Sequence, residues 1–158
     1  MNQKTLSRWL KGLILVVGGA ALLLYAVILP YLTAHYTPFS ENATAKWLWL
    51  SMIWLTALPF YPALALCWQI AARIGDGKSF SCENALALKH ISTLSLIDTL
   101  LLFTGSLLLF LLGMNRLTML VFALLFCFLG FLLSVAAAAL SHLVYKAAAL
   151  QEENDLTV

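Results

Sequence analysis

The chain has 158 residues, of which 63% are hydrophobic and only 10% are charged, and its mean hydropathy is +0.94. Soluble domains carry about 25% charged residues, so water cannot be the main solvent of this protein. A formal net charge of +2 is too small to favour direct binding to nucleic acid, and the positive residues are better explained as determinants of membrane topology.

Four apolar stretches are each long enough to cross a hydrocarbon core about 30 Å thick, which takes about 20 helical residues. Segments in lipid must be helical here, because every backbone polar group needs a partner within the segment. We therefore predict an all-α fold, in which residues 1–158 form a single transmembrane domain built as a four-transmembrane-helix bundle. The predicted spans are residues 10–33, 47–71, 90–112 and 117–139.

Lysine and arginine are distributed unequally between the two sides of this topology. Only Lys46 and Arg116 lie on one side. The other side carries Lys4, Arg8, Lys11, Arg73, Lys78, Lys89 and Lys146. By the positive-inside rule, both termini and the middle loop are cytoplasmic, and we expect a multi-pass protein of the bacterial inner membrane. The first apolar run exceeds the 7–15 residues of a cleavable signal, so we expect it to remain as an anchor.

The first two spans contain residues that shape helix packing. Gly18 and Gly19 lie at mid-depth in the first span, where small residues allow helices to approach closely. Pro59 and Pro62 lie in the second span and remove two backbone donors, so we predict a bend there. The bend serves packing or, as an alternative, a functional hinge.

The third helix is predicted to begin before the membrane does. Ser81 precedes Glu83 and Asn84, a pattern typical of an N-cap followed by an acid in the first turn. From residue 82 to residue 112 the helix would measure about 46 Å, well beyond the hydrocarbon core. Residues 82–89 are therefore expected to form a cytoplasmic extension.

The fourth helix is predicted to pair with the third and to extend beyond the membrane. The short turn at residues 113–116 makes an antiparallel hairpin. A packing face is indicated by small residues at four-residue spacing, Gly130, Ser134 and Ala138, with Ala137 and Ser141 beside them. Helical periodicity continues through residues 140–152, which we expect to project into the cytoplasm.

Asp98 is the one carboxylate inside a predicted span, and an ionisable residue at such depth is a functional candidate. Ser95 and Thr99 are its polar neighbours along the helix, and Tyr61 and Ser134 are expected at the same depth on other spans. Three roles remain open. Asp98 forms an interhelical hydrogen bond, takes part in proton or ion coupling, or senses a conformational change or a partner.

No motif for catalysis or for a cofactor is present. The chain has no nucleophile elbow, phosphate-binding loop, dinucleotide fingerprint or zinc-protease helix, so we do not expect an enzyme. Its three cysteines are unspaced for metal, and His90 and His142 are isolated, so no metal site or disulfide framework is predicted.

Two segments carry a resemblance to a known family. They are Lys78-Ser79-Phe80-Ser81-Cys82-Glu83-Asn84-Ala85 and the ending Ala149-Leu150-Gln151-Glu152-Glu153-Asn154-Asp155-Leu156-Thr157-Val158. With the overall span pattern, they resemble the bacterial membrane family catalogued as domain of unknown function 2975 (DUF2975). That family is similar in size and has four predicted spans. Its members are often encoded beside a small helix-turn-helix repressor, which implies a link to a DNA-binding regulator, and it has no established catalytic residues.

The resemblance and the overrunning helices indicate the same cytoplasmic surface. We predict a membrane-embedded regulatory or interaction protein in which this surface binds a soluble partner, with acidic residues facing a basic regulator. The candidate partner-binding residues are Ser81, Glu83, Asn84, Lys89, Lys146, Gln151, Glu152, Glu153 and Asp155.

Other readings of the same residues stay open. In one alternative, Asn84 and Glu153 cap and brace the two helices at the membrane surface and do not bind a partner. The alternative functions are a small oligomeric channel or proton-linked transporter using Asp98, and a stress or immunity protein acting on the membrane itself. The expected partners are the lipid bilayer, the small DNA-binding regulator and, for a pore, further copies of the chain.

Overall fold

The structure, a computed structural model, describes residues 3–35 and 43–156, with the side chains of residue 43 and residues 154–156 left out. The predicted partner contact at Asp155 therefore lies outside the described side chains. The first helical run comprises α1 (Gln3–Leu23), the π-helical segment η1 (Leu24–Ile28) and α2 (Leu29–His35). It is followed by α3 (Ala43–Gly75), α4 (Cys82–Leu111) and α5 (Leu117–Leu156).

The predicted all-α fold is confirmed, and four helices have the length and composition to cross a membrane. They cover Gln3–His35, Thr44–Gly75, Cys82–Leu111 and Leu117–Glu153. Large apolar side chains are mostly exposed along these helices, whereas the buried positions are chiefly small, such as Ala71, Ala85 and Ala137. This distribution is what a protein with lipid on its outside requires, because small residues let helices approach and lipid solvates the larger ones.

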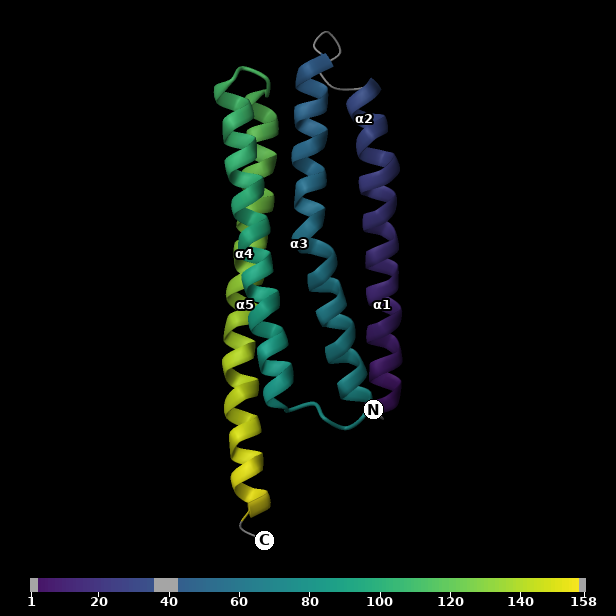
Figure 1. The fold of residues 1–158 in the computed structure, drawn as a ribbon, viewed down its shortest axis with the longest axis vertical. Coiled ribbons are helices and arrows are strands. Elements are labelled where there is room, and N and C mark those ends of the chain that lie inside the picture. The colour runs from purple at the N-terminus through teal and green to yellow at the C-terminus, as the bar shows by residue number, and fades with distance from the viewer. Residues whose placement is uncertain (1–2, 36–42, 157–158) are drawn as a thin grey trace.

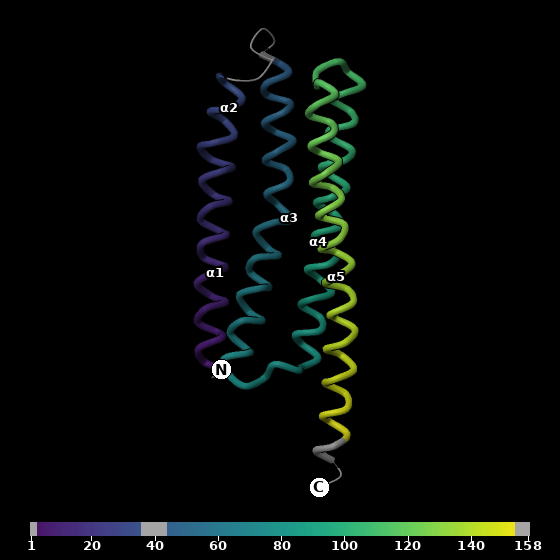
Figure 2. The backbone as a smooth tube through the Cα atoms, turned by 180° about the vertical axis from the view of Figure 1, so that it is seen from behind, coloured from purple at the N-terminus to yellow at the C-terminus, as the bar shows by residue number. Residues whose placement is uncertain are grey.

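The helices run antiparallel to their chain neighbours and form an open arrangement (Figures 1 and 2). The first helical run contacts α3, α3 contacts α4, and α4 contacts α5. Within the described residues, the backbone of the first run approaches neither α4 nor α5. The bundle is therefore not closed into a ring, and a space remains between its first and last helices.

Both short connections use a glycine with positive φ to end a helix. Gly77 (φ 80°) follows α3 and Gly113 (φ 69°) follows α4. In each case the backbone N–H after the glycine donates to a carbonyl five residues back. Lys78 donates to Arg73 at 3.0 Å, and Met114 donates to Leu109 at 2.9 Å. These are Schellman motifs, which satisfy the last helical carbonyls and reverse the chain within a few residues.

Prolines distort two of the helices in different ways. Pro30 has no N–H, and its ring crowds the carbonyl four residues back. Just before it, the N–H of Leu29 donates to the carbonyl of Leu24, five residues back, which is the hydrogen-bond pattern of the π-helical segment η1. The helix around Pro59 and Pro62 stays continuous, and α3 changes direction near its middle (Figure 1). The predicted bend is therefore present.

All four helical runs exceed the thickness of the hydrocarbon core, not only the last two. The first run and α3 have 33 residues each, against 30 in α4 and 40 in α5. The first run and α3 are this long because the segments that begin at Gln3 and Ala43, before each apolar stretch, are also helical. At 1.5 Å per residue α5 is about 60 Å long. It alone extends past the ends of its neighbours (Figure 1).

Candidate functional site

The two last helices are joined by a seam of small and hydroxyl-bearing side chains. On α5, these residues alternate spacings of three and four, which keeps them on one helix face. They are Cys127, Gly130, Ser134, Ala137, Ser141, Val144 and Ala148. The predicted packing face is therefore correct at Gly130, Ser134, Ala137 and Ser141 but wrong at Ala138, which is exposed. A strict four-residue spacing drifts around the helix, whereas alternate three and four follow a partner helix.

Hydrogen bonds across the seam fix its register. Ser141 donates to the carbonyl of Ala85 at 2.7 Å, and Ser134 donates to that of Ser92 at 2.9 Å. Ser95 donates to the carbonyl of Gly130 at 3.0 Å. Side-chain donors that reach backbone carbonyls on the facing helix are favourable in lipid, because no water competes for them. The pair α4–α5 is therefore the most strongly connected part of the molecule.

Asp98 lies on α4 at the edge of this seam and faces a cavity of about 600 Å³. All four helical runs contribute to its walls, among them Tyr25 of η1, Thr56 of α3 and Phe126 of α5. The Oδ1 atom of Asp98 is buried and has no hydrogen-bond partner among the described residues. A buried acceptor without a partner is unusual and calls for an explanation. Asp98 thus makes no interhelical hydrogen bond with the residues that the structure describes.

The other polar residues predicted around Asp98 divide into two groups. Ser95 and Thr99 line the same cavity as Asp98. Ser134 instead belongs to the seam, where it is 5% exposed and bonded to Ser92. Tyr61 is 37% exposed and is not among the residues that line the cavity. Depth along a helix follows from counting residues, but the direction in which a side chain points depends on helix rotation, and this separates Tyr61 from Asp98.

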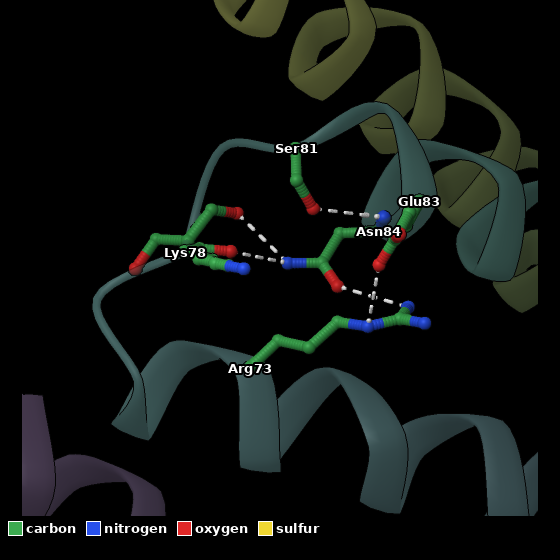
Figure 3. A network of polar contacts seen from close by, with 6 residues as sticks. Arg73, Lys78, Ser81, Glu83 and Asn84 are labelled. Carbon is green, nitrogen blue, oxygen red and sulfur yellow. Dashed lines mark hydrogen bonds and ion pairs between the residues drawn. The ribbon is translucent and has the colours of Figure 1, made fainter.

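At the end of the bundle that carries both termini, Asn84 holds the connection between α3 and α4 (Figure 3). Its side-chain amide donates to the carbonyls of Lys78 at 2.9 Å and Ser79 at 3.1 Å. Its oxygen accepts from Arg73 at 3.5 Å, and its own backbone N–H donates to the Ser81 hydroxyl at 3.2 Å. The predicted N-cap at Ser81 is thus confirmed.

This network changes the interpretation of two predicted partner contacts. Asn84 is 1% exposed, so its side chain cannot meet a partner in this conformation, and the prediction that it does so is wrong. It braces α3, the loop and α4, rather than α4 and α5. Glu83 pairs with Arg73 through Oε2 and Nε at 3.1 Å, but it is 69% exposed, so the pair contributes little to stability.

The remaining partner candidates are accessible. Ser81 is half-buried at the N-cap, and Lys89 is exposed on α4. The exposed candidates on α5 are Lys146, Gln151, Glu152 and Glu153. Ala148 is the last buried residue of α5, and every side chain described from Leu150 to Glu153 is exposed. We call residues 149–156 the projecting end of α5. Within the predicted extension, residues 140–152, the first part still packs in the bundle, since Ser141 donates to Ala85 and Val144 is buried.

Comparison with known proteins identifies the family. The model of the family described as "Protein of unknown function (DUF2975)" matches residues 32–158. The chain belongs to the DUF2975 family. A curated relative, the "Uncharacterized membrane protein YoaS" of Bacillus subtilis (strain 168), is 29% identical over 148 residues, covering 91% of this chain and 92% of the relative. No solved structure matches. This DUF2975 protein is therefore a membrane protein, as its relative is described.

Several polar residues in and beside the cavity were not predicted from the sequence. Tyr25 and Thr56 meet through their hydroxyl groups at 3.2 Å, and the indole of Trp54 donates to the carbonyl of Tyr25 at 3.3 Å. Asn115, in the turn before α5, also lines the cavity and has a buried Oδ1 without a partner among the described residues. Pro30 was the one signal in the sequence for the position of Tyr25, because a proline there distorts the helical segment on which Tyr25 lies.

Proposed function

We propose that this DUF2975 protein is a membrane-embedded regulatory protein of the bacterial inner membrane, with both termini in the cytoplasm. In this proposal the projecting end of α5 binds a soluble partner. The observation that carries it is the continuation of α5 past every other helix at this end of the bundle (Figure 2), with the side chains from Leu150 to Glu153 exposed. Exposed side chains on a helix end that extends beyond the rest of the bundle are accessible to a soluble partner.

The chemistry of the projecting end favours a basic partner. Leu150 is 66% exposed and lies beside three exposed polar residues, Gln151, Glu152 and Glu153. An exposed leucine with acidic neighbours combines an apolar contact with long-range attraction to a positive surface. A small DNA-binding regulator has such a surface, so the membrane protein would hold it away from DNA or release it.

Site-specific photo-crosslinking tests the proposal in intact cells. A photoreactive phenylalanine analogue replaces Gln151, and the control carries it at Leu132, an exposed apolar position farther back on α5. We expect a crosslinked soluble protein at position 151 and none at position 132. Reversing two charges, Glu152→Lys with Glu153→Lys, should weaken the crosslink, whereas Asp76→Lys in the α3–α4 loop should not. Equal crosslinking at both positions, or none, would contradict the proposal.

A second candidate function, a proton-linked transporter or an oligomeric channel, is favoured by the cavity around Asp98. The acid lies between the spans and faces space that all of them line. Flux across liposomes measures this function directly. If flux is absent, or is the same in the Asp98→Asn variant, the cavity does not conduct.

A further inference from the structure

The cavity at Asp98 has the size and lining of a small-molecule site. Its volume of about 600 Å³ falls within the roughly 300–1,000 Å³ typical of ligand pockets. Its wall on α4 extends from Ser95 to Ser106, about 17 Å along the helix axis. Five aromatic side chains line it, Tyr25, Trp49, Phe60, Phe122 and Phe126. The cavity is therefore long, apolar and aromatic.

The hydroxyl groups beside Asp98 have no proton left to give it. Thr99 donates to the carbonyl of Ser95 at 2.8 Å, and Ser95 donates across the seam to Gly130. Thr56 donates to the carbonyl of Ile53 at 2.7 Å. Because a hydroxyl has one proton, the bond between Tyr25 and Thr56 must use the proton of Tyr25.

The surroundings of Asp98 thus lack a free hydroxyl donor. Oδ1 of Asp98 and Oδ1 of Asn115 are both buried without partners, and no lysine, arginine or histidine lines the cavity in the described part of the chain. A buried acceptor that stays unpaired loses its hydrogen bonds to water without replacement, which destabilises the protein. An occupant that brings a donor, and preferably a positive charge, removes this deficit.

We propose that this cavity binds a hydrophobic organic cation, whose ammonium group donates to Oδ1 of Asp98 and whose apolar body lies against the aromatic walls. The faces of aromatic rings attract cations as well as apolar groups, so the lining and the acid select the same ligand. An anionic ligand would be repelled by the carboxyl oxygen of Asp98. An uncharged acyl chain would fill the cavity but would leave that oxygen without a hydrogen bond. The site lies between the spans and does not depend on the projecting end of α5.

Binding of decylammonium to the purified full chain in lipid nanodiscs tests this inference. Tritiated decylammonium is titrated, and the signal from empty nanodiscs is subtracted. We expect saturable binding at one site per chain. Decanol and decanoate, which have the same chain with a neutral or an anionic head, should compete weakly. Asp98→Asn should weaken decylammonium binding by roughly tenfold to a hundredfold, because a hydrogen bond to a charged group is lost.

Two further variants make the result decisive. Asp76→Asn removes an acid from the loop outside the cavity and should leave binding unchanged. Ala123→Phe narrows the cavity from α5 while keeping the acid, so it should reduce binding even if Asp98→Asn does not fold. The inference is overturned by an absence of saturable binding, by binding that Ala123→Phe leaves unchanged, or by equal competition from decanol. The last result would indicate a site for any lipid chain.

Discussion

At the scale of single residues, Asn84 and Asp98 are opposite cases of a buried polar side chain. Asn84 has its amide and its oxygen engaged by the loop and by Arg73. Asp98 has an oxygen buried with no partner among the described residues. Fully paired polar groups specify a structure, whereas an unpaired one costs stability and is retained for another reason. Asn84 therefore has a structural role, and the binding role that we propose for Asp98 accounts for its unpaired oxygen.

Replacing Asn84 should destabilise the protein. Asn84→Ala leaves two loop carbonyls without a donor, at a cost of about 1–3 kcal/mol. Asn84→Asp should be no better, because a carboxylate would face the same two carbonyl oxygens. The measurement is the melting temperature in mild detergent, with Lys89→Ala, an exposed position on the same helix, as the control. A melting temperature equal to that of the control would show that the loop does not need this brace.

Replacing Asp98 should have the opposite effect on stability. Asp98→Leu removes a buried acceptor that no group satisfies and adds apolar surface to the cavity, so the melting temperature should stay the same or rise. A fall of the size expected for Asn84→Ala would mean that Asp98 stabilises the bundle after all. The measurement is again the melting temperature in mild detergent, with Lys89→Ala as the control.

At the scale of elements, the α4–α5 pair depends on close approach at Gly130. A Cβ atom there would collide with the Oγ1 atom of Thr99, and a β-branched side chain has few other rotamers to adopt. Gly19, by contrast, has open space around its Cα. The two glycines therefore serve different purposes although both lie within apolar helices.

This difference predicts unequal effects of the same substitution. Gly130→Ala should lower the free energy of unfolding by about 1–3 kcal/mol through overpacking. Gly19→Ala should be neutral or slightly stabilising, since alanine favours the helix at both sites. Combining Gly130→Ala with Thr99→Ala should recover part of the loss, as unfolding measurements on a double-mutant cycle would show. Equal effects at the two glycines would be inconsistent with the close approach.

Element boundaries followed from local chemistry, but side-chain directions did not. The Ser81 cap, the turn at Gly113 and the bend at the two prolines depend on residues within a few positions, so the sequence was enough. Which of the neighbouring residues Ala137 and Ala138 is buried depends on the position of the facing helix. The place of Tyr25 in the cavity depends on the π-helical segment and on how far apart the first and last helices stand.

At the scale of the whole molecule, the strongly connected α4–α5 pair is joined to the first helical run through α3, which contacts both the first run and α4. This open arrangement leaves room for the cavity and for the free end of α5. Family membership and four membrane-length helices were predicted from the sequence, since hydropathy and short motifs are local properties. The openness of the bundle was not, because it is set by which helix faces meet.

The sidedness of the projecting end is the central claim, because a cytoplasmic regulator can reach it only from that side. In a background with the three cysteines replaced, single cysteines are placed by Glu152→Cys and by Met114→Cys at the opposite end. A membrane-impermeant maleimide is applied to spheroplasts. We predict labelling of the position 114 variant in intact spheroplasts, and labelling of the position 152 variant only after permeabilisation. Labelling at position 152 in intact spheroplasts would contradict the proposed topology and the regulatory function built on it.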